Sequence, residues 1–280
     1  MPLDLRRELE VACTAARAAG AELLRFFGAQ LDVQRKEHAE PVTEADRASE
    51  AVILPALRQA FPDYGILSEE QSDQCSWRQR RVAWLVDPMD GTRDFIAHRE
   101  GFAVMIGLLV DLQPVLGVIF QPTTGVLYRA AAGCGPAEMV VGPAAEPLAP
   151  SGQTELNQSR LVTSMSYRNP RIETIKRALG ITDELRLGSL GLKASLVARG
   201  DRDLYLNLEG HGKLWDACAP QAILTRAGGR FTDIHGDPIR YDDPGQLRLT
   251  RGVLASNAAL HRPAVAALRS LLADDSDSTG

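Results

Sequence analysis

The sequence lacks the cysteine pattern of a disulfide-stabilised protein. Its four cysteines, Cys13, Cys75, Cys134 and Cys218, form no CxxC motif and no paired spacing among 280 residues. Isolated cysteines in a chain of this length are typical of reduced thiols in a cytosolic protein. The sequence therefore predicts a fold that does not depend on disulfide bonds.

The sequence also lacks an excess of positive charge. Its 31 Lys and Arg residues are outnumbered by 36 Asp and Glu residues, which gives a formal net charge of −5. Because nucleic-acid binding depends on a positive field that neutralises phosphates, we expect no nucleic-acid partner. The one short basic cluster, Arg78, Arg80 and Arg81, is expected to lie in a solvated loop.

No apolar run reaches the roughly 18 residues that a membrane span requires. The N-terminal segment 1–27 spaces its apolar residues at helical intervals with charges between them, which is unlike a signal peptide. With 45% hydrophobic and 24% charged residues, the composition is that of an ordinary globular protein. We therefore expect a soluble, cytoplasmic protein without stable membrane insertion.

What the sequence does contain is an ordered series of apolar segments. Its first part predicts a helix over 4–28, a strand near 31–36 and a second helix that Thr43 caps. The runs "YGILSEE" and "RVAWLVDP" are short, apolar and end in acids, as strands that deliver side chains to a strand end do. Residues 102–131 predict three antiparallel strands, with turns at 111–113 and 122–125.

The second part of the chain alternates strands and helices. A segment rich in Pro, Gly and Ala (131–153) precedes it and predicts a lobe boundary near 145–157. We then expect strands near 160–164, 184–187, 203–207, 230–233 and 252–255, and helices over 170–179, 190–199, 215–227 and 263–272. Because the first part is mostly a meander, the order favours a layered α/β or α+β fold over a simple doubly wound sheet. The prediction is one domain over 1–280 with two lobes, 1–150 and 151–280.

Two aspartates, Asp87 and Asp90, follow directly on an apolar run in "VDPMDGT". Pro88 lies between them and lacks an N–H, so we expect the chain to turn there rather than continue the strand. Two carboxylates that face one point repel each other unless a cation lies between them, and Mg²⁺ prefers such oxygen ligands. Gly91 and Thr92 begin the next helical stretch, whose free N–H groups favour an anion. The alternative for this motif alone is an ordinary Asp–Pro turn.

Other acids occur at comparable places. Glu69 and Glu70 end the strand of "YGILSEE", Asp216 opens a helix, and Asp46 lies in the first turn of another. Each has a plain alternative, as a solvated strand end or a helix cap. The five histidines show no ligand spacing and are expected to be surface or core residues. One candidate set of metal ligands is Glu69, Asp87, Asp90 and Asp216. Two Mg²⁺ ions would neutralise its four negative charges.

These motifs resemble a known family. The order "VTEAD", "SEE", "DPMDGT" and "WD", with Gly228-Gly229 following "WD" after eleven intervening residues, is similar to the signature of the lithium-sensitive inositol monophosphatase superfamily. The resemblance covers nearly the whole chain. It implies an α+β fold, the layered α-β-α-β-α sandwich of the inositol monophosphatase and fructose-1,6-bisphosphatase type. It also implies a Mg²⁺-dependent phosphatase acting on a small phosphomonoester, with lithium sensitivity and, as is common in the family, a homodimer.

The resemblance implies roles for individual residues. Thr92 and Asp46 resemble the pair that orients and deprotonates the attacking water. Glu70 is either a supporting acid behind the metal ligands or a surface residue. The lobe 1–150 would carry most of the metal ligands, and the lobe 151–280 would carry the last of them and substrate contacts. Two or three Mg²⁺ ions would be held by Glu69, Asp87, the Met89 carbonyl, Asp90 and Asp216.

Within the superfamily, the sequence looks most like the 3'(2'),5'-bisphosphate nucleotidase (CysQ-like) branch. Arg93-Asp94 after "DGT" and the segment 187–206 carry that likeness. Lys193 would then clamp a second phosphate, with an exposed helix lysine as the alternative. Two positions depart from it: Tyr167 stands where eukaryotic nucleotidases have a His, and Glu209 falls where inositol monophosphatases hold sugar hydroxyls. The substrate-binding residues implied in this way are Glu69, Asp90, Gly91, Thr92, Ser189, Lys193, Glu209 and Asp216.

The sequence leaves three functions open. The leading hypothesis is removal of the 3'-phosphate from adenosine 3',5'-bisphosphate, which gives AMP and phosphate. The second is the same chemistry on inositol or another sugar monophosphate. The third is a non-enzymatic role of the kind that some superfamily members have, although an intact set of acids argues against it as the sole function. The partner we expect is a small phosphorylated substrate.

Overall fold

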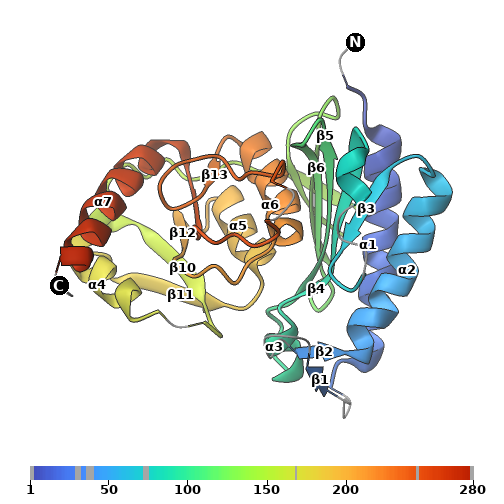
Figure 1. Ribbon diagram of the computed structural model, residues 1–280, viewed down its shortest axis with the longest axis horizontal. Coiled ribbons are helices and arrows are strands. Elements are labelled where there is room, and N and C mark those ends of the chain that lie inside the picture. Colours follow the sequence, from blue (N-terminus) through green and yellow to red (C-terminus); the bar gives the residue numbers. More distant parts are fainter. Residues whose placement is uncertain are drawn as a thin grey trace.

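The protein is built from five layers of helices and sheets, which follow one another from right to left in Figure 1. The computed structural model describes residues 3–28, 33–35, 41–71, 76–167, 169–243 and 246–277. Helices α1 and α2 form one outer layer, and a seven-stranded sheet follows. Helices α5 and α6 lie in the middle, a five-stranded sheet comes next, and α4 and α7 form the other outer layer. The predicted α-β-α-β-α sandwich of the α+β class is confirmed.

The first outer layer consists of α1 (Arg6–Phe26) and α2 (Glu44–Ala60). A small two-stranded sheet of β1 (Val33–Arg35) and β2 (Pro41–Thr43) precedes α2. The hydroxyl of Thr43 accepts a hydrogen bond from the Ala45 N–H at 3.2 Å and so caps α2, as predicted. Both helices bury an apolar face in one core with the strands of the seven-stranded sheet.

The seven-stranded sheet has the order β3-β4-β5-β6-β7-β8-β9, in which only β3 and β4 run parallel. The three predicted antiparallel strands and both predicted turns are confirmed. Two further strands lie in the segment that was predicted to be a boundary loop, because its Pro and Gly residues masked an exposed hairpin at the sheet edge. The strands are β3 (Gly65–Ser68), β4 (Val82–Asp90), β5 (Ala103–Val110), β6 (Gln113–Gln121), β7 (Val126–Ala131), β8 (Glu138–Val141) and β9 (Ala144–Pro147).

Strand β4 bends at Pro88 but does not end there. Asp87 pairs with Met105 of β5 and Asp90 pairs with Ala103, with a shift of register between the two pairs. The prediction that Pro88 turns the chain out of the ladder is therefore wrong, because a β-bulge accommodates the missing N–H. The short helix α3 (Thr92–Ile96) follows at once.

Two glycines let the central helix α6 (Leu214–Ala227) approach the seven-stranded sheet closely. A Cβ atom at Gly117 would lie only 2.2 Å from the carbonyl oxygen of Ala219, and one at Gly107 would lie 2.6 Å from Sγ of Cys218. Real Cβ atoms do not make such short contacts, so these positions require glycine for space. These two contacts therefore determine how closely α6 packs against the seven-stranded sheet.

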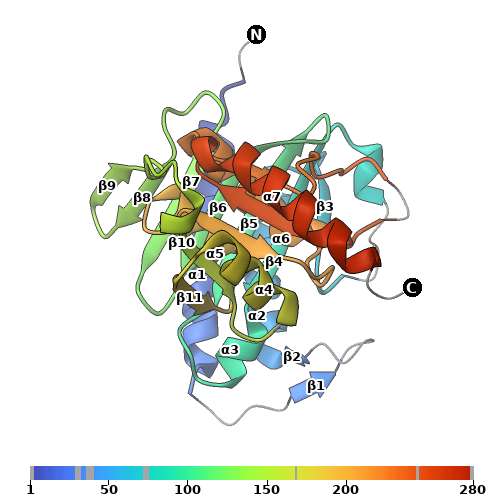
Figure 2. The same cartoon turned by 90° about the vertical axis from the view of Figure 1, so that its left-hand side faces the viewer.

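The five-stranded sheet has the order β11-β10-β12-β14-β13, with β10 parallel to β11 and β12. Figure 2 shows α7 lying across it in front of the sheet. The predicted elements are confirmed, except that α7 begins at Ala258 rather than near 263, because Pro263 lies inside the helix. The elements are β10 (Arg160–Ser164), α4 (Pro170–Leu179), β11 (Asp183–Leu187), α5 (Leu190–Ala198), β12 (Leu204–Asn207), β13 (Arg230–Thr232), β14 (Val253–Ser256) and α7 (Ala258–Asp277).

The seven-stranded sheet ends at Pro147 and the five-stranded sheet begins at Arg160, with a short 3₁₀ helix (Leu156–Gln158) in the connection. The division into lobes 1–150 and 151–280 stays a prediction. Cys13, Cys134 and Cys218 are free thiols, whereas Cys75 lies outside the described residues. Within the described ranges, no helix is long and apolar enough to cross a lipid bilayer.

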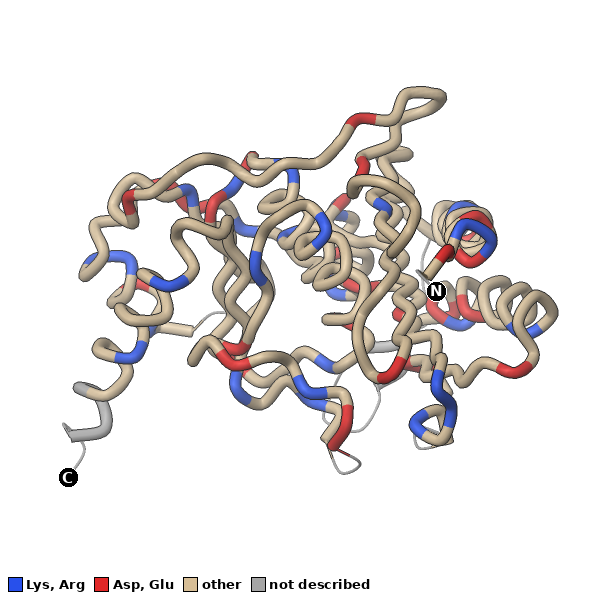
Figure 3. The backbone as a smooth tube through the Cα atoms, turned by 90° about the horizontal axis from the view of Figure 1, so that it is seen from above, with Lys and Arg blue, Asp and Glu red and all other residues tan. Residues whose placement is uncertain are grey.

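Positively and negatively charged residues are interspersed along the chain, as the coloured backbone tube in Figure 3 shows. The predicted solvated cluster of arginines is only partly solvated. Arg80 and Arg81 are exposed, but Arg78, in a 3₁₀ helix (Ser76–Gln79), donates hydrogen bonds to the carbonyls of Tyr241 at 3.2 Å and Gln246 at 3.1 Å. Arg78 therefore ties this loop to the C-terminal part of the chain.

Candidate active site

The bulge at the end of β4 presents the first two candidate metal ligands. Asp87 is buried, and its Oδ1 accepts a hydrogen bond from the Met89 N–H at 2.9 Å. Ser49 of α2 donates to the carbonyl of Pro88 at 2.7 Å and so fixes the bulge against α2. The main chain itself therefore holds Asp87 in place.

Asp90 is held by the start of α5. Its Oδ2 accepts hydrogen bonds from the Ser189 hydroxyl at 2.5 Å and from the Gly191 N–H at 2.8 Å. The Ser189 oxygen also accepts from the Leu192 N–H at 3.0 Å and caps α5. Ser189 is fully buried and is not among the cavity-lining residues. The structure gives Ser189 a task that was not predicted, the orientation of Asp90, and its contact with substrate stays a prediction.

Asp216 lies in the first turn of α6, where its Oδ2 accepts a hydrogen bond from the Lys213 N–H at 2.7 Å. Its two sequence interpretations, helix cap and metal ligand, are compatible, because it also lines the cavity. Burial raises the pKa of Asp216 to about 8, and the neighbouring carboxylates of Asp90 and Glu69 contribute to the rise. The charged form of Asp216 is therefore disfavoured unless a cation lies beside it.

Glu69 follows β3 directly, and its N–H donates to the carbonyl of Val86 on β4 at 3.2 Å. This contact places Glu69 in the wall of the cavity, whereas Glu70 is half-buried and does not line it. Burial raises the pKa of Asp87 well above its ordinary value, and Glu69 is the first of the neighbouring carboxylates that raise it further. The structure thus brings together the carboxylate cluster, defined here as Glu69, Asp87, Asp90 and Asp216, in one cavity of about 130 Å³.

The donors of the carboxylate cluster fit a hard divalent cation. Carboxylate and carbonyl oxygens are the ligands of Mg²⁺, which usually takes one or two carboxylates and keeps several waters. Buried carboxylates that raise one another's pKa favour a cation between them. Across the described part of the chain, no three His, Cys, Asp or Glu side chains enclose a metal position by themselves. The chain therefore offers a partial ligand shell of the kind that Mg²⁺ accepts.

Thr92 and Asp46, the predicted water-activating pair, lie side by side. Oδ1 of Asp46 lies 3.3 Å from the Thr92 hydroxyl, which has the Met89 carbonyl at 3.1 Å as its alternative acceptor. Oδ2 of Asp46 accepts from the N–H and the hydroxyl of Thr43, so one carboxylate oxygen is fixed and the other faces Thr92. Burial raises the pKa of Asp46 to about 7, against the lowering effect of the Thr43 hydrogen bonds.

Lys193 lies in the cavity wall and is only 2% exposed, so the alternative of an exposed helix lysine is wrong. Its Nζ donates to the carbonyls of Leu187 at 3.2 Å and Gly188 at 2.5 Å, and it lies 5.2 Å from the ring centroid of Tyr205. Burial lowers the pKa of Lys193 to about 8, although the nearby carboxylate of Asp90 opposes this shift. Its positive charge thus lies beside the carboxylate cluster, deep in the protein.

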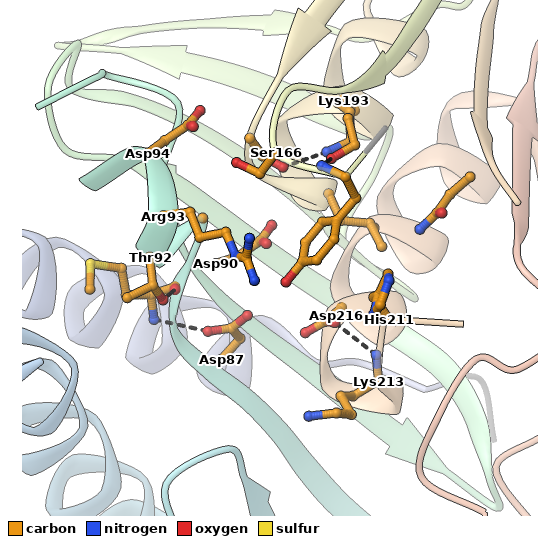
Figure 4. A pocket seen from close by; sticks show the side chains of 18 of the residues that line it. Asp87, Asp90, Thr92, Arg93, Asp94, Ser166, Lys193, His211, Lys213 and Asp216 are labelled. Atoms are coloured by element: carbon orange, nitrogen blue, oxygen red, sulfur yellow. Dashed lines mark hydrogen bonds between the residues drawn. The ribbon is translucent and has the colours of Figure 1, made fainter. Parts of the chain in front are cut away.

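The outer part of the cavity carries a different group of side chains. The guanidinium of Arg93 lies 4.6 Å from the ring centroid of Tyr167, and that ring stacks on His211 with centroids 4.3 Å apart. We call these three residues the outer stack. Figure 4 shows Asp87, Asp90 and Asp216 on the walls of the cavity and Arg93 extending between them toward its centre. The sequence did not predict this group, because its members come from three separate segments, the helix α3 and two loops.

Glu209 lies next to the outer stack. Its Oε2 is 2.8 Å from Nε2 of His211, and it lines a neighbouring cavity of about 210 Å³ rather than the first one. The two cavities share Tyr167 and Asn207 in their walls. Asp94, in contrast, is buried and forms an ion pair with Arg99 at 2.5 Å, so it does not neutralise Arg93.

Comparison with known proteins identifies the family. The sequence matches the Inositol monophosphatase family over residues 4–273. The chain belongs to this family. The 3'(2'),5'-bisphosphate nucleotidase CysQ of Salmonella typhimurium is 36% identical over 245 residues, which are 83% of this chain and 93% of that protein. The inositol-1-monophosphatase of Synechocystis is 33% identical over 270 residues, which are 93% of this chain and 88% of that protein.

A solved inositol monophosphatase structure from Anabaena agrees with this assignment. It is 32% identical and has a TM-score of 0.76, covering 96% of this chain and 97% of that chain. As a member of the inositol monophosphatase family, the chain is a metal-dependent phosphatase that acts on a small phosphorylated molecule. The roles of its individual site residues stay predictions, which the geometry described above supports.

Proposed function

We propose that this phosphatase removes the 3'-phosphate of adenosine 3',5'-bisphosphate and releases AMP and phosphate. The observation that carries the proposal is the division of charge in one cavity. The carboxylate cluster lies in its inner part, while three cationic side chains also line it, namely Arg93, Lys193 and Lys213. Such a cavity suits a substrate with more negative charge than one phosphate. The likeness to the CysQ nucleotidases supports the same substrate class.

Magnesium is the metal that these donors fit best, and we propose two or three ions. Glu69, Asp87, the Met89 carbonyl, Asp90 and Asp216 are the groups that would hold them. When bound, such ions neutralise charge on the phosphate oxygens and favour ionisation of a coordinated water. The chain supplies the oxygen donors, and Ser189 and the main chain keep those donors oriented.

The Thr92–Asp46 pair supplies the proton acceptor in this proposal. The Thr92 hydroxyl orients the attacking water and passes a proton toward Oδ1 of Asp46. Because Thr43 occupies the other oxygen of Asp46, the free oxygen is the one that faces Thr92. A carboxylate whose pKa lies near neutrality suits a general base that works near pH 7.

A second candidate function is hydrolysis of an inositol or sugar monophosphate. Two observations favour it: the likeness to the Synechocystis inositol-1-monophosphatase and the carboxylate of Glu209 beside the cavity. A carboxylate accepts hydrogen bonds from ring hydroxyls, but it repels a second phosphate. Because Glu209 faces the neighbouring cavity and pairs with His211, it does not obstruct a bisphosphate in the first.

Phosphate release from a panel of substrates distinguishes the two functions. The panel is adenosine 3',5'-bisphosphate, inositol 1-phosphate and fructose 1,6-bisphosphate, each with saturating Mg²⁺. We expect the highest kcat/KM for adenosine 3',5'-bisphosphate. A higher kcat/KM for inositol 1-phosphate, with loss of that activity in Glu209→Ala, would establish the second function instead.

A further inference from the structure

The three cations of the cavity are not equally available to a ligand. Lys193 is buried, and its ammonium group donates to two main-chain carbonyls beside Asp90. Lys213 lies 5.1 Å from the ring centroid of Trp215 and is half-buried next to Asp216. Both charges therefore serve the inner part of the cavity. Arg93, in contrast, is exposed.

Arg93 is held by a ring rather than by an acid. Its guanidinium lies 4.6 Å from the centroid of Tyr167, and that ring is supported from behind by His211. Stacking of this kind occupies the flat face of a guanidinium but leaves the N–H groups at its edge available. Asp94, its neighbour in sequence, turns into the protein and pairs with Arg99. The described residues thus place an oriented donor fork at the outer part of the cavity.

We infer that Arg93 is the residue that selects substrates with a second phosphate, by binding that phosphate while the first lies at the carboxylate cluster. The inference rests on the proposed function and adds to it the group that determines specificity. A guanidinium fork matches two phosphate oxygens at once, which a lysine cannot do. Tyr167 and His211 keep the fork oriented before the substrate arrives, so little side-chain entropy is lost on binding.

This assignment moves the second-phosphate contact from Lys193 to Arg93. Lys193 has protein acceptors for its ammonium group and lies beside Asp90, where its charge stabilises the carboxylate cluster. Arg93 lies on the short helix α3, directly after Thr92. A phosphate bound to Arg93 would therefore lie next to a phosphate held at the carboxylate cluster, because both groups line one cavity.

A contact to the non-reacting phosphate has a defined kinetic signature. It is formed equally in the bound substrate and in the transition state, so its loss raises KM and leaves kcat nearly unchanged. The effect should occur only with substrates that carry the second phosphate. Adenosine 3',5'-bisphosphate and adenosine 3'-monophosphate form a matched pair, because they differ only in that group.

The test compares wild type, Arg93→Gln and Arg93→Lys on this pair, with Mg²⁺ saturating. Wild type should prefer the bisphosphate, and Arg93→Gln should lower that preference by about 10- to 100-fold, the value of hydrogen bonds to a charged group. Arg93→Lys should retain part of the preference, because it keeps the charge but not the fork. Arg81→Gln is the matched control: it removes the same charge from an exposed arginine at the other end of β4, where Arg81 pairs with Asp111.

Inhibition by products provides a second readout that does not depend on turnover of the bisphosphate. AMP retains the 5'-phosphate, so its inhibition constant should rise by a similar factor in Arg93→Gln, while that of inorganic phosphate should stay constant. If wild type fails to hydrolyse the bisphosphate, the proposed function is wrong. If wild type prefers the bisphosphate and Arg93→Gln keeps that preference, or loses activity equally on both substrates, the assignment of Arg93 is wrong.

Discussion

The carboxylate cluster and the outer stack line the same cavity, but they are held in different ways. Main-chain N–H groups fix the acids: Met89 holds Asp87, Gly191 holds Asp90 and Lys213 holds Asp216. The outer stack rests on contacts of side chains with side chains, and its outer members are exposed. Under the proposed roles, the fold fixes the groups that perform the chemistry, whereas substrate choice depends on residues that can change without disturbing the fold.

Replacement of one acid of the carboxylate cluster should cause the largest loss of activity. Asp90→Asn keeps the shape of the side chain but removes a charged ligand, so activity should fall by more than ~100-fold, beyond what loss of a supporting residue costs. Removal of Mg²⁺ by a chelator should abolish activity. Without metal, Asp90→Asn should be at least as stable as wild type, because burial raises the pKa of Asp90 and so disfavours its charged form. Steady-state kinetics and thermal unfolding check these effects, and near-normal turnover of Asp90→Asn at saturating Mg²⁺ would refute the ligand assignment.

Loss of the proton acceptor should be the next largest effect. Thr92→Ala and Asp46→Asn should each lower kcat by about 10²- to 10⁴-fold with little change in KM, since general-base assistance has this value. The kcat of the double variant should be only slightly lower than the kcat of the less active single variant, because the two side chains act as a unit. Full additivity of the two losses in kcat would show that Thr92 and Asp46 have separate tasks.

Removal of Ser189 should weaken the inner region through Asp90 rather than directly. Ser189→Ala should raise the Mg²⁺ concentration needed for half-maximal activity by about 10- to 100-fold, as loss of a residue behind a metal ligand does. Ser195→Ala is the matched control, because Ser195 is equally buried on α5 but donates to the Gly191 carbonyl at 2.9 Å instead of to Asp90. An unchanged Mg²⁺ requirement in Ser189→Ala would show that the hydrogen bond to Asp90 has no functional role.

The smallest effect should come from the edge of the outer stack. Glu209→Gln removes the charge that lies 2.8 Å from Nε2 of His211, and partly exposed contacts of this kind contribute at most about 1 kcal/mol. We expect the preference for adenosine 3',5'-bisphosphate over inositol 1-phosphate to change by less than ~10-fold, with the melting temperature unaltered. A substantial fall in melting temperature would mean that the outer stack stabilises the fold. The carboxylate cluster and the outer stack would then not differ in this respect.

The inner region was largely predictable from the sequence, and the outer one was not. Asp87 and Asp90 lie in the last part of β4 and Asp216 lies in the first turn of α6, and the ends of elements deliver side chains to one place in a layered fold. The task of Ser189 was missed because its partner Asp90 is 99 residues away in sequence. Tyr167 and His211 carry no local pattern, since a stack of rings from separate loops exists only after the layers have assembled.

The strands β8 and β9 show where local sequence signals failed to predict secondary structure. Their hairpin lies in a segment rich in Pro and Gly, which normally indicates a loop, yet each strand pairs with its neighbour over several residues. An edge hairpin needs little apolar burial, so the sequence carries little hydrophobic periodicity there. Local signals are therefore weakest where an element contributes least to the core.

The contact of Gly117 with α6 has a consequence for variants found in screens or in natural populations. The glycine leaves no room for a methyl group against Ala219, and the same helix carries Asp216 in its first turn. A Gly117→Ala substitution would displace α6 and with it one of the acids of the cavity. Genetic screens would then report a loss of phosphatase activity at a position that contacts neither metal nor substrate. Sequence variants in this interface should therefore be judged by helix displacement, not by distance from the reacting phosphate.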